Sequence, residues 1–211
     1  MKFSVCVDAV FRGRDIFESL VQIKKLEIDT FEFWKWWGID LTPYRRAIDE
    51  LDMKISCFCT KSFCLTDAGL RDQYIEDLKA SIETAKLLGA RKLITQVGNE
   101  LPDIPRVKQH QNIVNGLKAC VPILEDAGIM LLFEPLNTVV DHKGYYLYSS
   151  DEAFEIQDEV GSPYVKVLFD IYHQQIMEGN LISRITKNID KIGHFHAAGN
   201  PGRHELDNGE I

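Results

Sequence analysis

The sequence has little of what would place it in a membrane, among disulfide-rich secreted proteins or on nucleic acid. No apolar run approaches the roughly 18 residues that a membrane-spanning helix needs, and residues 1–8 do not have the pattern of a signal peptide. The five cysteines are an odd number and too sparse for a disulfide framework. With 24 Lys and Arg against 32 Asp and Glu, the net charge is −8, which disfavours a phosphate-backbone partner. We therefore expect a cytoplasmic protein with reduced thiols, no membrane association and no nucleic-acid partner.

The remaining composition is that of a globular protein. Hydrophobic residues make up 45% of the chain and charged residues 27%, enough apolar material for one sizeable core. Cys57, Cys59 and Cys64 lie close enough in sequence to suggest a metal site. Cys57 and Cys59, however, share one face of a predicted strand, where a free cysteine packs as a small hydrophobe. We favour core packing for them over metal binding.

Short apolar runs recur along the chain, and each predicts a β-strand. They are too continuous to alternate with polar residues, a pattern typical of parallel strands covered on both faces. The seven runs are Phe3–Val7, Ile28–Phe33, Lys54–Cys59, Lys92–Val97, Ile129–Glu134, Val165–Asp170 and Ile192–Ala197. Because parallel strands need crossover connections, we expect helices between the runs.

The segments between the runs carry the signals of such helices. Apolar residues at helical spacing predict two amphipathic helices, with Tyr74, Leu78, Ile82, Ala85 and Leu88 in one and Ile113, Leu117, Val121 and Leu124 in the other. Thr42, followed by a proline, predicts an N-cap, and Ser150 a helix start. Gly89 and Gly128 predict left-handed residues at helix ends. Pro122 predicts a kink or a late start of its helix.

The alternation of strands and helices predicts right-handed βαβ units in a single α/β domain over residues 1–211. A doubly wound sheet would carry a glycine-rich loop after the first strand, and residues 9–14 contain none. A (β/α)8 TIM barrel fits better, but it has eight strands and seven are found. The expected fold is therefore a (β/α)8 barrel truncated after strand seven. Either the sequence is a fragment, or the sheet stays open with two unpaired edges.

Three polar residues close consecutive predicted strands, at the end where barrels carry their chemistry. Glu134 closes the fifth strand, Asp170 closes the sixth and His196 lies in the seventh. Any one alone would be an ordinary solvated residue, but together they predict a site. Two carboxylates and an imidazole suit a divalent metal, Mg²⁺ or Mn²⁺, with Co²⁺ or Zn²⁺ tolerated.

Two further polar residues are candidates for substrate binding. His173 comes three residues after the sixth strand and would lie over the same carboxyl-end face of the barrel as Glu134, Asp170 and His196. It either orients a substrate oxygen or is an ordinary surface histidine. Arg203 lies in a polar, turn-rich loop downstream of the seventh strand. It either binds a carboxylate through two parallel hydrogen bonds or is an exposed loop residue.

His194 and the aromatic cluster at 31–37 have less specific roles. We expect His194 to point to the opposite side of its strand from His196, as a packing histidine. Trp34 or Trp36 either walls a small polar pocket or belongs to the core.

Four motifs in the second half of the chain are shared with a known family. They are Phe-Glu-Pro-Leu-Asn at 133–137, Val-Asp-His-Lys-Gly-Tyr-Tyr at 140–146, Phe-Asp-Ile-Tyr-His-Gln-Gln-Ile-Met-Glu-Gly-Asn at 169–180, and Gly-His-Phe-His followed by Pro-Gly-Arg-His-Glu within 193–205. On these motifs the sequence resembles the hydroxypyruvate isomerase branch of the xylose isomerase-like barrels, which also contains ketose 3-epimerases. Before residue 133 only the spacing of the predicted strands and the pair Glu32-Phe33 look similar.

The resemblance implies a role for each matching residue. Glu134 would be both a metal ligand and one catalytic acid–base, and Asp170 and His196 would be further ligands. His173 and Arg203 would contact the substrate.

The resemblance also implies a reaction, the isomerisation of hydroxypyruvate to tartronate semialdehyde through an enediolate. In that family a second glutamate on strand eight completes the metal shell and handles the other proton. No residue here matches it, since Glu210 belongs to the loop motif after strand seven. We therefore expect a polypeptide that ends at Ile211 to be inactive or nearly so.

Three rival functions stay open. A ketose 3-epimerase would use the same metal and the same kind of glutamates on a longer sugar. An abasic-site endonuclease needs more metal ligands than the sequence offers and a basic DNA-binding face, which the net charge of −8 does not supply. A non-catalytic barrel relative would act as an interaction module. For the isomerase or epimerase, the expected partner is a small-molecule substrate, a short hydroxy-keto acid or sugar, and a homo-oligomer is possible.

Overall fold

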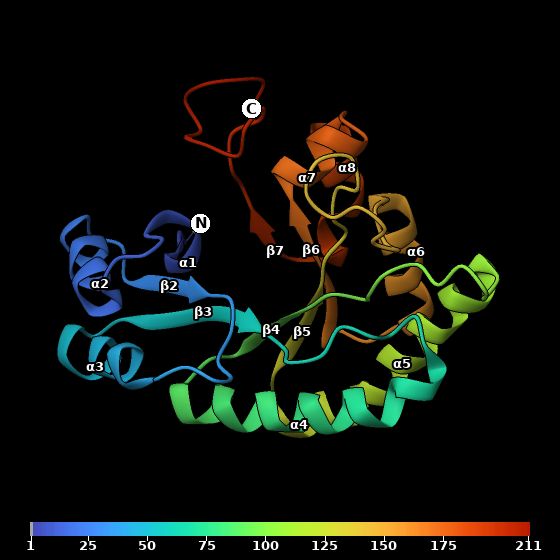
Figure 1. Ribbon diagram of the computed structural model, residues 1–211, viewed down its shortest axis with the longest axis horizontal. Helices are drawn as coiled ribbons and strands as arrows, with labels where there is room; N and C mark the ends of the chain where they lie inside the picture. Colours follow the sequence, from blue (N-terminus) through green and yellow to red (C-terminus); the bar gives the residue numbers. More distant parts are fainter. Residues whose placement is uncertain (1) are drawn as a thin grey trace.

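The protein is built on a curved parallel sheet with helices along its outer side (Figure 1). This computed structural model describes residues 2–211. The strands are β1 (Val5–Cys6), β2 (Thr30–Phe33), β3 (Lys54–Cys59), β4 (Lys92–Thr95), β5 (Met130–Phe133), β6 (Val165–Asp170) and β7 (Ile192–His196). They are hydrogen-bonded in sequence order, and every neighbouring pair is parallel. All seven predicted strands are confirmed.

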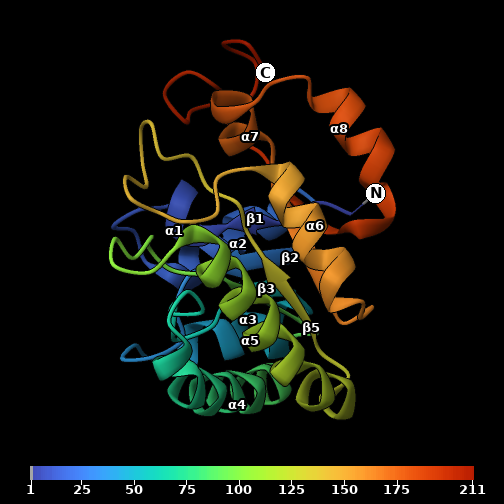
Figure 2. The same cartoon turned by 90° about the vertical axis from the view of Figure 1, so that its right-hand side faces the viewer.

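Helices cover the outside of this sheet. They are α1 (Val7–Val10), α2 (Ile16–Lys25), α3 (Thr42–Leu51), α4 (Arg71–Leu88), α5 (Arg106–Ala127), α6 (Ser150–Val160), α7 (Ile171–Met177) and α8 (Leu181–Asn188), with short 3₁₀ turns η1 (Ala68–Leu70) and η2 (Ile189–Lys191). Helix α5 packs between α4 and α6, and α7 lies near the C-terminal segment (Figure 2). Among residues 2–211 no strand pairs with the outer edge of β1 or β7, so the sheet is an open half-barrel of the TIM-barrel type.

The strand register sorts side chains between the inside of the sheet and the helix layer. Paired residues of neighbouring parallel strands share a face, and Leu168 pairs with His194 while Asp170 pairs with His196. Leu168 belongs to a small apolar cluster inside the sheet, together with Cys57, Ile94 and Leu132. The inner face therefore has an apolar floor, with polar side chains above it at the carboxyl ends of the strands.

The helix boundaries follow from local backbone chemistry. Gly89 and Gly128 end α4 and α5 with φ of 74° and 63°, the left-handed conformation that glycine adopts without strain, as predicted. Ser150 begins α6, also as predicted. Thr42 is not an N-cap: it is the first residue of α3, and its N–H donates to Asp40 Oδ1 at 2.9 Å. The late helix start at Pro122 is wrong as well, because α5 begins at Arg106 and runs through it.

A histidine clamp joins α5 to α6 on the outer surface. His110 Nδ1 lies 3.1 Å from Glu152 Oε1, and His110 Nε2 lies 2.8 Å from Glu159 Oε1. Burial opposes the charged imidazole, but the two carboxylates outweigh it and raise the pKa of His110 above its ordinary value of 6.5. The folded state thus holds this proton more tightly than the unfolded chain does.

We expect the clamp to make stability depend on pH in one direction. A pKa raised on folding gives stability that is fully present below pH 6.5 and is lost as pH rises through the higher folded pKa. The free energy of unfolding lost in His110→Gln, measured by urea titration, should be largest in mildly acidic buffer and should shrink in alkaline buffer. A difference that is constant across this range contradicts the clamp.

No helix within residues 2–211 combines the length and the apolar character needed to cross a bilayer.

Candidate metal centre and active site

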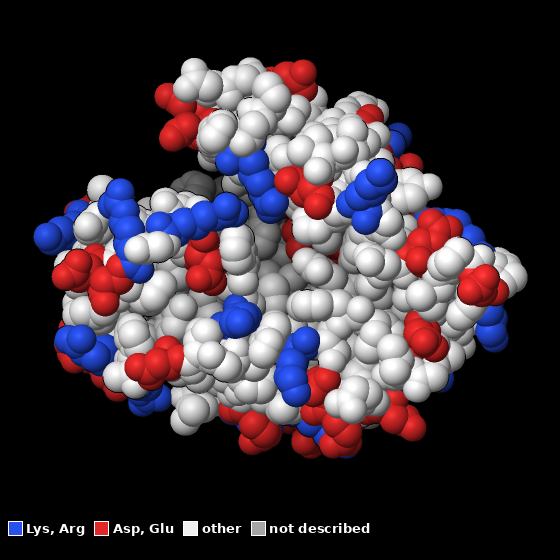
Figure 3. Space-filling model, in the orientation of Figure 1, with Lys and Arg blue, Asp and Glu red and all other residues white. Residues whose placement is uncertain are grey.

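A hollow opens at the carboxyl ends of β2, β6 and β7, below the C-terminal segment, and charged side chains lie at its margin (Figure 3). It contains a cavity of about 160 Å³ with polar and aromatic walls. Its walls include Glu32, Trp34, Asp170, His196 and Arg203. Strands β2, β6 and β7 and the loop after β7 therefore contribute to one pocket, as expected for the carboxyl-end face of a barrel.

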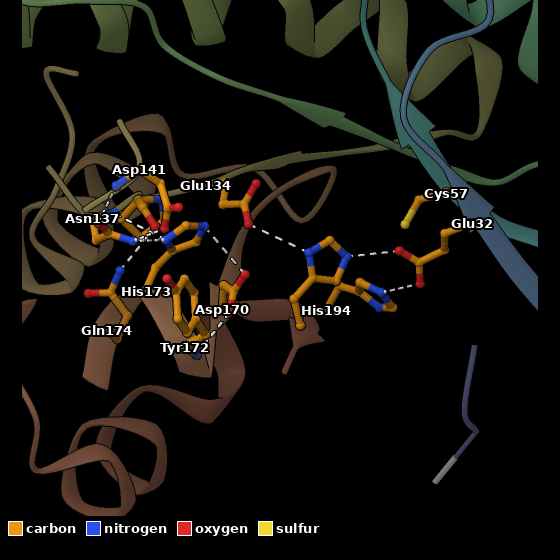
Figure 4. A network of polar contacts seen from close by, with 12 residues as sticks. Glu32, Cys57, Glu134, Asn137, Asp141, Asp170, Tyr172, His173, Gln174 and His194 are labelled. Carbon is orange, nitrogen blue, oxygen red and sulfur yellow. Dashed lines mark hydrogen bonds and ion pairs between the residues drawn. The ribbon is translucent and has the colours of Figure 1, made fainter. Parts of the chain in front are cut away.

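Glu134, Asp170 and His173 form one group of possible metal ligands. One donor atom from each lies within 4.8 Å of the others, and all three residues are buried. Asp170 also caps α7, since its Oδ1 accepts the N–H of Tyr172 at 2.9 Å, which leaves Oδ2 facing His173 Nε2 at 3.6 Å (Figure 4). Buried carboxylates are costly unless they are paired or bind a cation, so the two carboxylates of this group, Glu134 and Asp170, fit a hard divalent ion.

Asn137 fixes the orientation of the His173 ring. Its backbone N–H lies 3.3 Å from His173 Nδ1 and its side-chain Nδ2 lies 2.7 Å from the same atom. Because a backbone N–H can only donate, Nδ1 must be the acceptor, and the proton of neutral His173 lies on Nε2. The imidazole therefore presents an N–H toward Asp170 and the cavity.

Arg203 reaches the pocket from the loop after β7. Its guanidinium lies 5.1 Å from the centre of the Tyr172 ring, Nη2 lies 3.5 Å from His173 Nε2, and Nη1 lies 4.0 Å from Asp141 Oδ2. None of these contacts is a close two-pronged pairing with a carboxylate. The guanidinium therefore retains donors for a further acidic group.

Glu32 brings β2 into contact with β7. Its Oε1 lies 2.9 Å from His194 Nε2 and also accepts a hydrogen bond from the Ser4 hydroxyl, while its Oε2 lies 2.8 Å from His196 Nε2 (Figure 4). Both histidines thus point inward, and the prediction that His194 faces the opposite side is wrong. Residues two apart on a strand share a face, so the spacing predicted the same side for both.

Charge in the site is organised around His196. Its Nδ1 lies 3.5 Å from Glu134 Oε1, on the far side of the ring from Glu32. Burial opposes the charged ring, but hydrogen bonds with Cys57, Glu134 and Glu32 raise the pKa of His196 well above its ordinary value. Burial likewise opposes the charge of Glu134, yet His196, His173 and Arg203 hold its pKa below the usual range. Glu134 is therefore ionised, as a ligand or a base must be.

The structure brings together the residues singled out from the sequence. Glu134 and Asp170 lie in one group with His173, while His196 contacts Glu134 through Nδ1 and Glu32 through Nε2. Arg203 lines the cavity.

Of the two tryptophans considered for the pocket, Trp34 lines the cavity. Trp36 packs against Trp37, and its indole Nε1–H donates to Ser81 Oγ at 3.3 Å. Cys57 is fully buried in the apolar floor, although its sulfur is also close to Glu32 and His196. Sequence reasoning missed Glu32 as a site residue. A charged residue within the buried run at 31–33 was the available signal.

Comparison with known proteins gives the same architecture. The sequence profile of a family described as "Xylose isomerase-like TIM barrel" matches residues 20–211. A hydroxypyruvate isomerase from Escherichia coli (strain K12) is 35% identical over 143 residues, which are 68% of this chain and 55% of that protein. A 2-oxo-tetronate isomerase from Cupriavidus necator is 34% identical over 131 residues, 62% of this chain and 50% of that protein. The chain thus spans about half the length of these relatives.

Solved structures support the fold over the whole chain. A crystal structure described as an AP endonuclease of family 2 from Brucella melitensis superposes with a TM-score of 0.92 at 23% identity, covering 100% of this chain and 84% of that one. Similarity at this level of identity bears on the fold alone.

Proposed function

Because this chain belongs to the xylose isomerase-like TIM barrel family, we propose that it acts as a metal-dependent isomerase that converts hydroxypyruvate to tartronate semialdehyde. The observation that carries the proposal is the convergence of Glu134, Asp170 and His196 at the ends of three neighbouring strands. The similarity to hydroxypyruvate and 2-oxo-tetronate isomerases supports it. Both names denote reactions on short keto acids.

Glu134, Asp170 and His196 would hold the ion. Oxygen donors with a single imidazole suit Mg²⁺ or Mn²⁺, and the same set tolerates Zn²⁺. When bound, such an ion supplies Lewis acidity that stabilises negative charge developing on the substrate oxygens.

The remaining chemistry belongs to side chains of this chain. The reaction removes a C–H proton from one carbon and returns a proton to its neighbour, and Glu134 is the general base for one of these transfers. His173 donates its Nε2–H to a substrate oxygen. Arg203 binds the substrate carboxylate with the donors that its present contacts leave free, and Trp34 closes the cavity wall. Arg203 is the reason to favour a keto acid over a neutral ketose.

The test is turnover under controlled metal content. We expect the form extended through an eighth strand to isomerise hydroxypyruvate in the presence of Mg²⁺ or Mn²⁺ and to stop with EDTA, and the form that ends at Ile211 to show little or no turnover. The assay compares the chain with a version extended through an eighth strand that carries a glutamate, because that strand supplies the partner acid–base in the family that the sequence resembles. Fructose and tagatose are assayed in parallel. Turnover of the ketoses without hydroxypyruvate turnover contradicts the proposed substrate and favours a ketose 3-epimerase.

A further inference from the structure

Glu32 is a buried carboxylate with two imidazole partners. It is 4% exposed, and each of its oxygens faces the Nε2 atom of a different histidine, at 2.9 Å for His194 and 2.8 Å for His196. Within residues 2–211, no lysine or arginine forms an ion pair with it. Because an ionised carboxylate only accepts hydrogen bonds, both imidazoles must carry a proton on Nε2.

This arrangement decides which nitrogen of His196 faces the proposed ion. Nε2 is held by Glu32, so the other ring nitrogen, Nδ1, is the atom turned toward Glu134, at 3.5 Å from Oε1. A histidine that binds a metal through one nitrogen commonly donates the N–H of the other to a carboxylate, which fixes the ring and strengthens the ligand. Glu32 and His196 have the geometry of such a pair.

We propose that Glu32 is a positioning residue that holds His196 with Nδ1 directed at the ion bound by Glu134 and Asp170, and so sets the affinity for that ion. His194 and Ser4 bind the other carboxylate oxygen and prevent the group from rotating away. This inference rests on the metal site of the proposed function. It assigns a role to a strand, β2, that supplies no ligand to that site.

Glu32 could instead bind a metal ion itself. Glu32, Cys57, His194 and His196 bring donor atoms within 4.8 Å of one another and have the composition of a site for a soft ion such as Zn²⁺. Two observations favour the positioning role. Both Nε2 atoms are already engaged by Glu32, and Cys57 packs among apolar side chains, whereas Glu134 and Asp170 offer two carboxylates to an ion.

The experiment measures metal binding rather than turnover. Calorimetric titration of the metal-free chain with Mn²⁺ compares the unmodified protein with Glu32→Gln, Cys57→Ser and the exposed control Glu125→Gln. A glutamine has one acceptor oxygen, so it can accept an Nε2–H from only one of the two imidazoles. We expect Glu32→Gln to weaken Mn²⁺ binding by about 10- to 100-fold, and the other two variants to bind as the unmodified chain does.

Spectroscopy on the unmodified chain reports the ligand atoms directly, even where Glu32→Gln does not fold. With Co²⁺ bound, the absence of a sulfur-to-cobalt charge-transfer band is expected. With Zn²⁺ bound, nitrogen-15 spectra of the imidazoles should show His196 ligated through Nδ1 and protonated at Nε2. A thiolate band, ligation through Nε2 or weaker binding in Cys57→Ser overturns the positioning role and places the ion on the Cys57 side.

The titrations also separate this inference from the proposed function. Mn²⁺ binding that is lost in Glu134→Gln but unchanged in a folded Glu32→Gln overturns the role of Glu32 and leaves the isomerase proposal standing. An unmodified chain, with or without the eighth strand, that binds no divalent ion overturns both.

Discussion

Replacing Glu134 by glutamine is expected to slow hydroxypyruvate isomerisation by about 10²- to 10⁴-fold, the contribution typical of a positioned general base. The substitution keeps the size of the side chain but removes its charge, so the amide cannot accept the C–H proton. It also removes one of two carboxylates from the proposed ligand set. The loss should therefore be found in kcat at saturating metal and not only in the apparent metal affinity.

Two controls make this measurement specific. Glu125→Gln changes an exposed glutamate at the far end of α5 and should leave the rate unchanged. The assay is run in D₂O with the form of the chain that turns over, because an enediolate route exchanges the abstracted proton with solvent. Solvent deuterium should enter the product with unmodified Glu134, and its entry should fall with the rate in the variant. A Glu134→Gln protein with full turnover at saturating metal excludes Glu134 as the base.

The parallel sheet could be predicted from the sequence because its signals are local. Each strand is a short apolar run, and Gly89 and Gly128 mark helix ends by a conformation that depends on the glycine alone. The wrong predictions of an N-cap at Thr42 and of a late helix start at Pro122 are also local. Thr42 is the first residue of α3 and donates its own N–H to Asp40, two residues upstream, and α5 continues through its internal proline.

The candidate site also contains residues that local patterns reveal and one whose partners are distant in sequence. Glu134, Asp170 and His196 could be identified because each interrupts an apolar run at its end. Glu32 was missed. Its charge within the buried run at 31–33 marks it as unusual, but its partners His194 and His196 lie 162 and 164 positions away and meet it only once the sheet curves β7 toward β2. The sequence pattern could therefore flag Glu32 but could not name its partners.

The packing that holds β2 in place predicts the largest loss of stability. Phe33 is 1% exposed, and its ring centre lies 4.4 Å from that of Tyr44 on α3 and 4.9 Å from that of Phe58 on β3. Phe33→Ala removes this ring from between a strand and a helix and leaves a cavity. We expect a loss of about 3–5 kcal/mol in the free energy of unfolding, out of a total that is about 5–15 kcal/mol for a typical domain.

The matched control is Phe3→Ala, which removes the same ring from a residue that is 69% exposed and should change stability by no more than about 0.5 kcal/mol. Urea titrations of both variants give the comparison.

Phe33 and Glu32 lie on opposite faces of one strand, so the helix-side packing of Phe33 fixes the depth at which Glu32 meets His196. The folded fraction of Phe33→Ala should therefore also bind Mn²⁺ more weakly than Phe3→Ala. Equal stability in the two variants contradicts the anchoring of β2 on α3, and weaker stability with unchanged Mn²⁺ affinity shows that Glu32 keeps its place without that anchor.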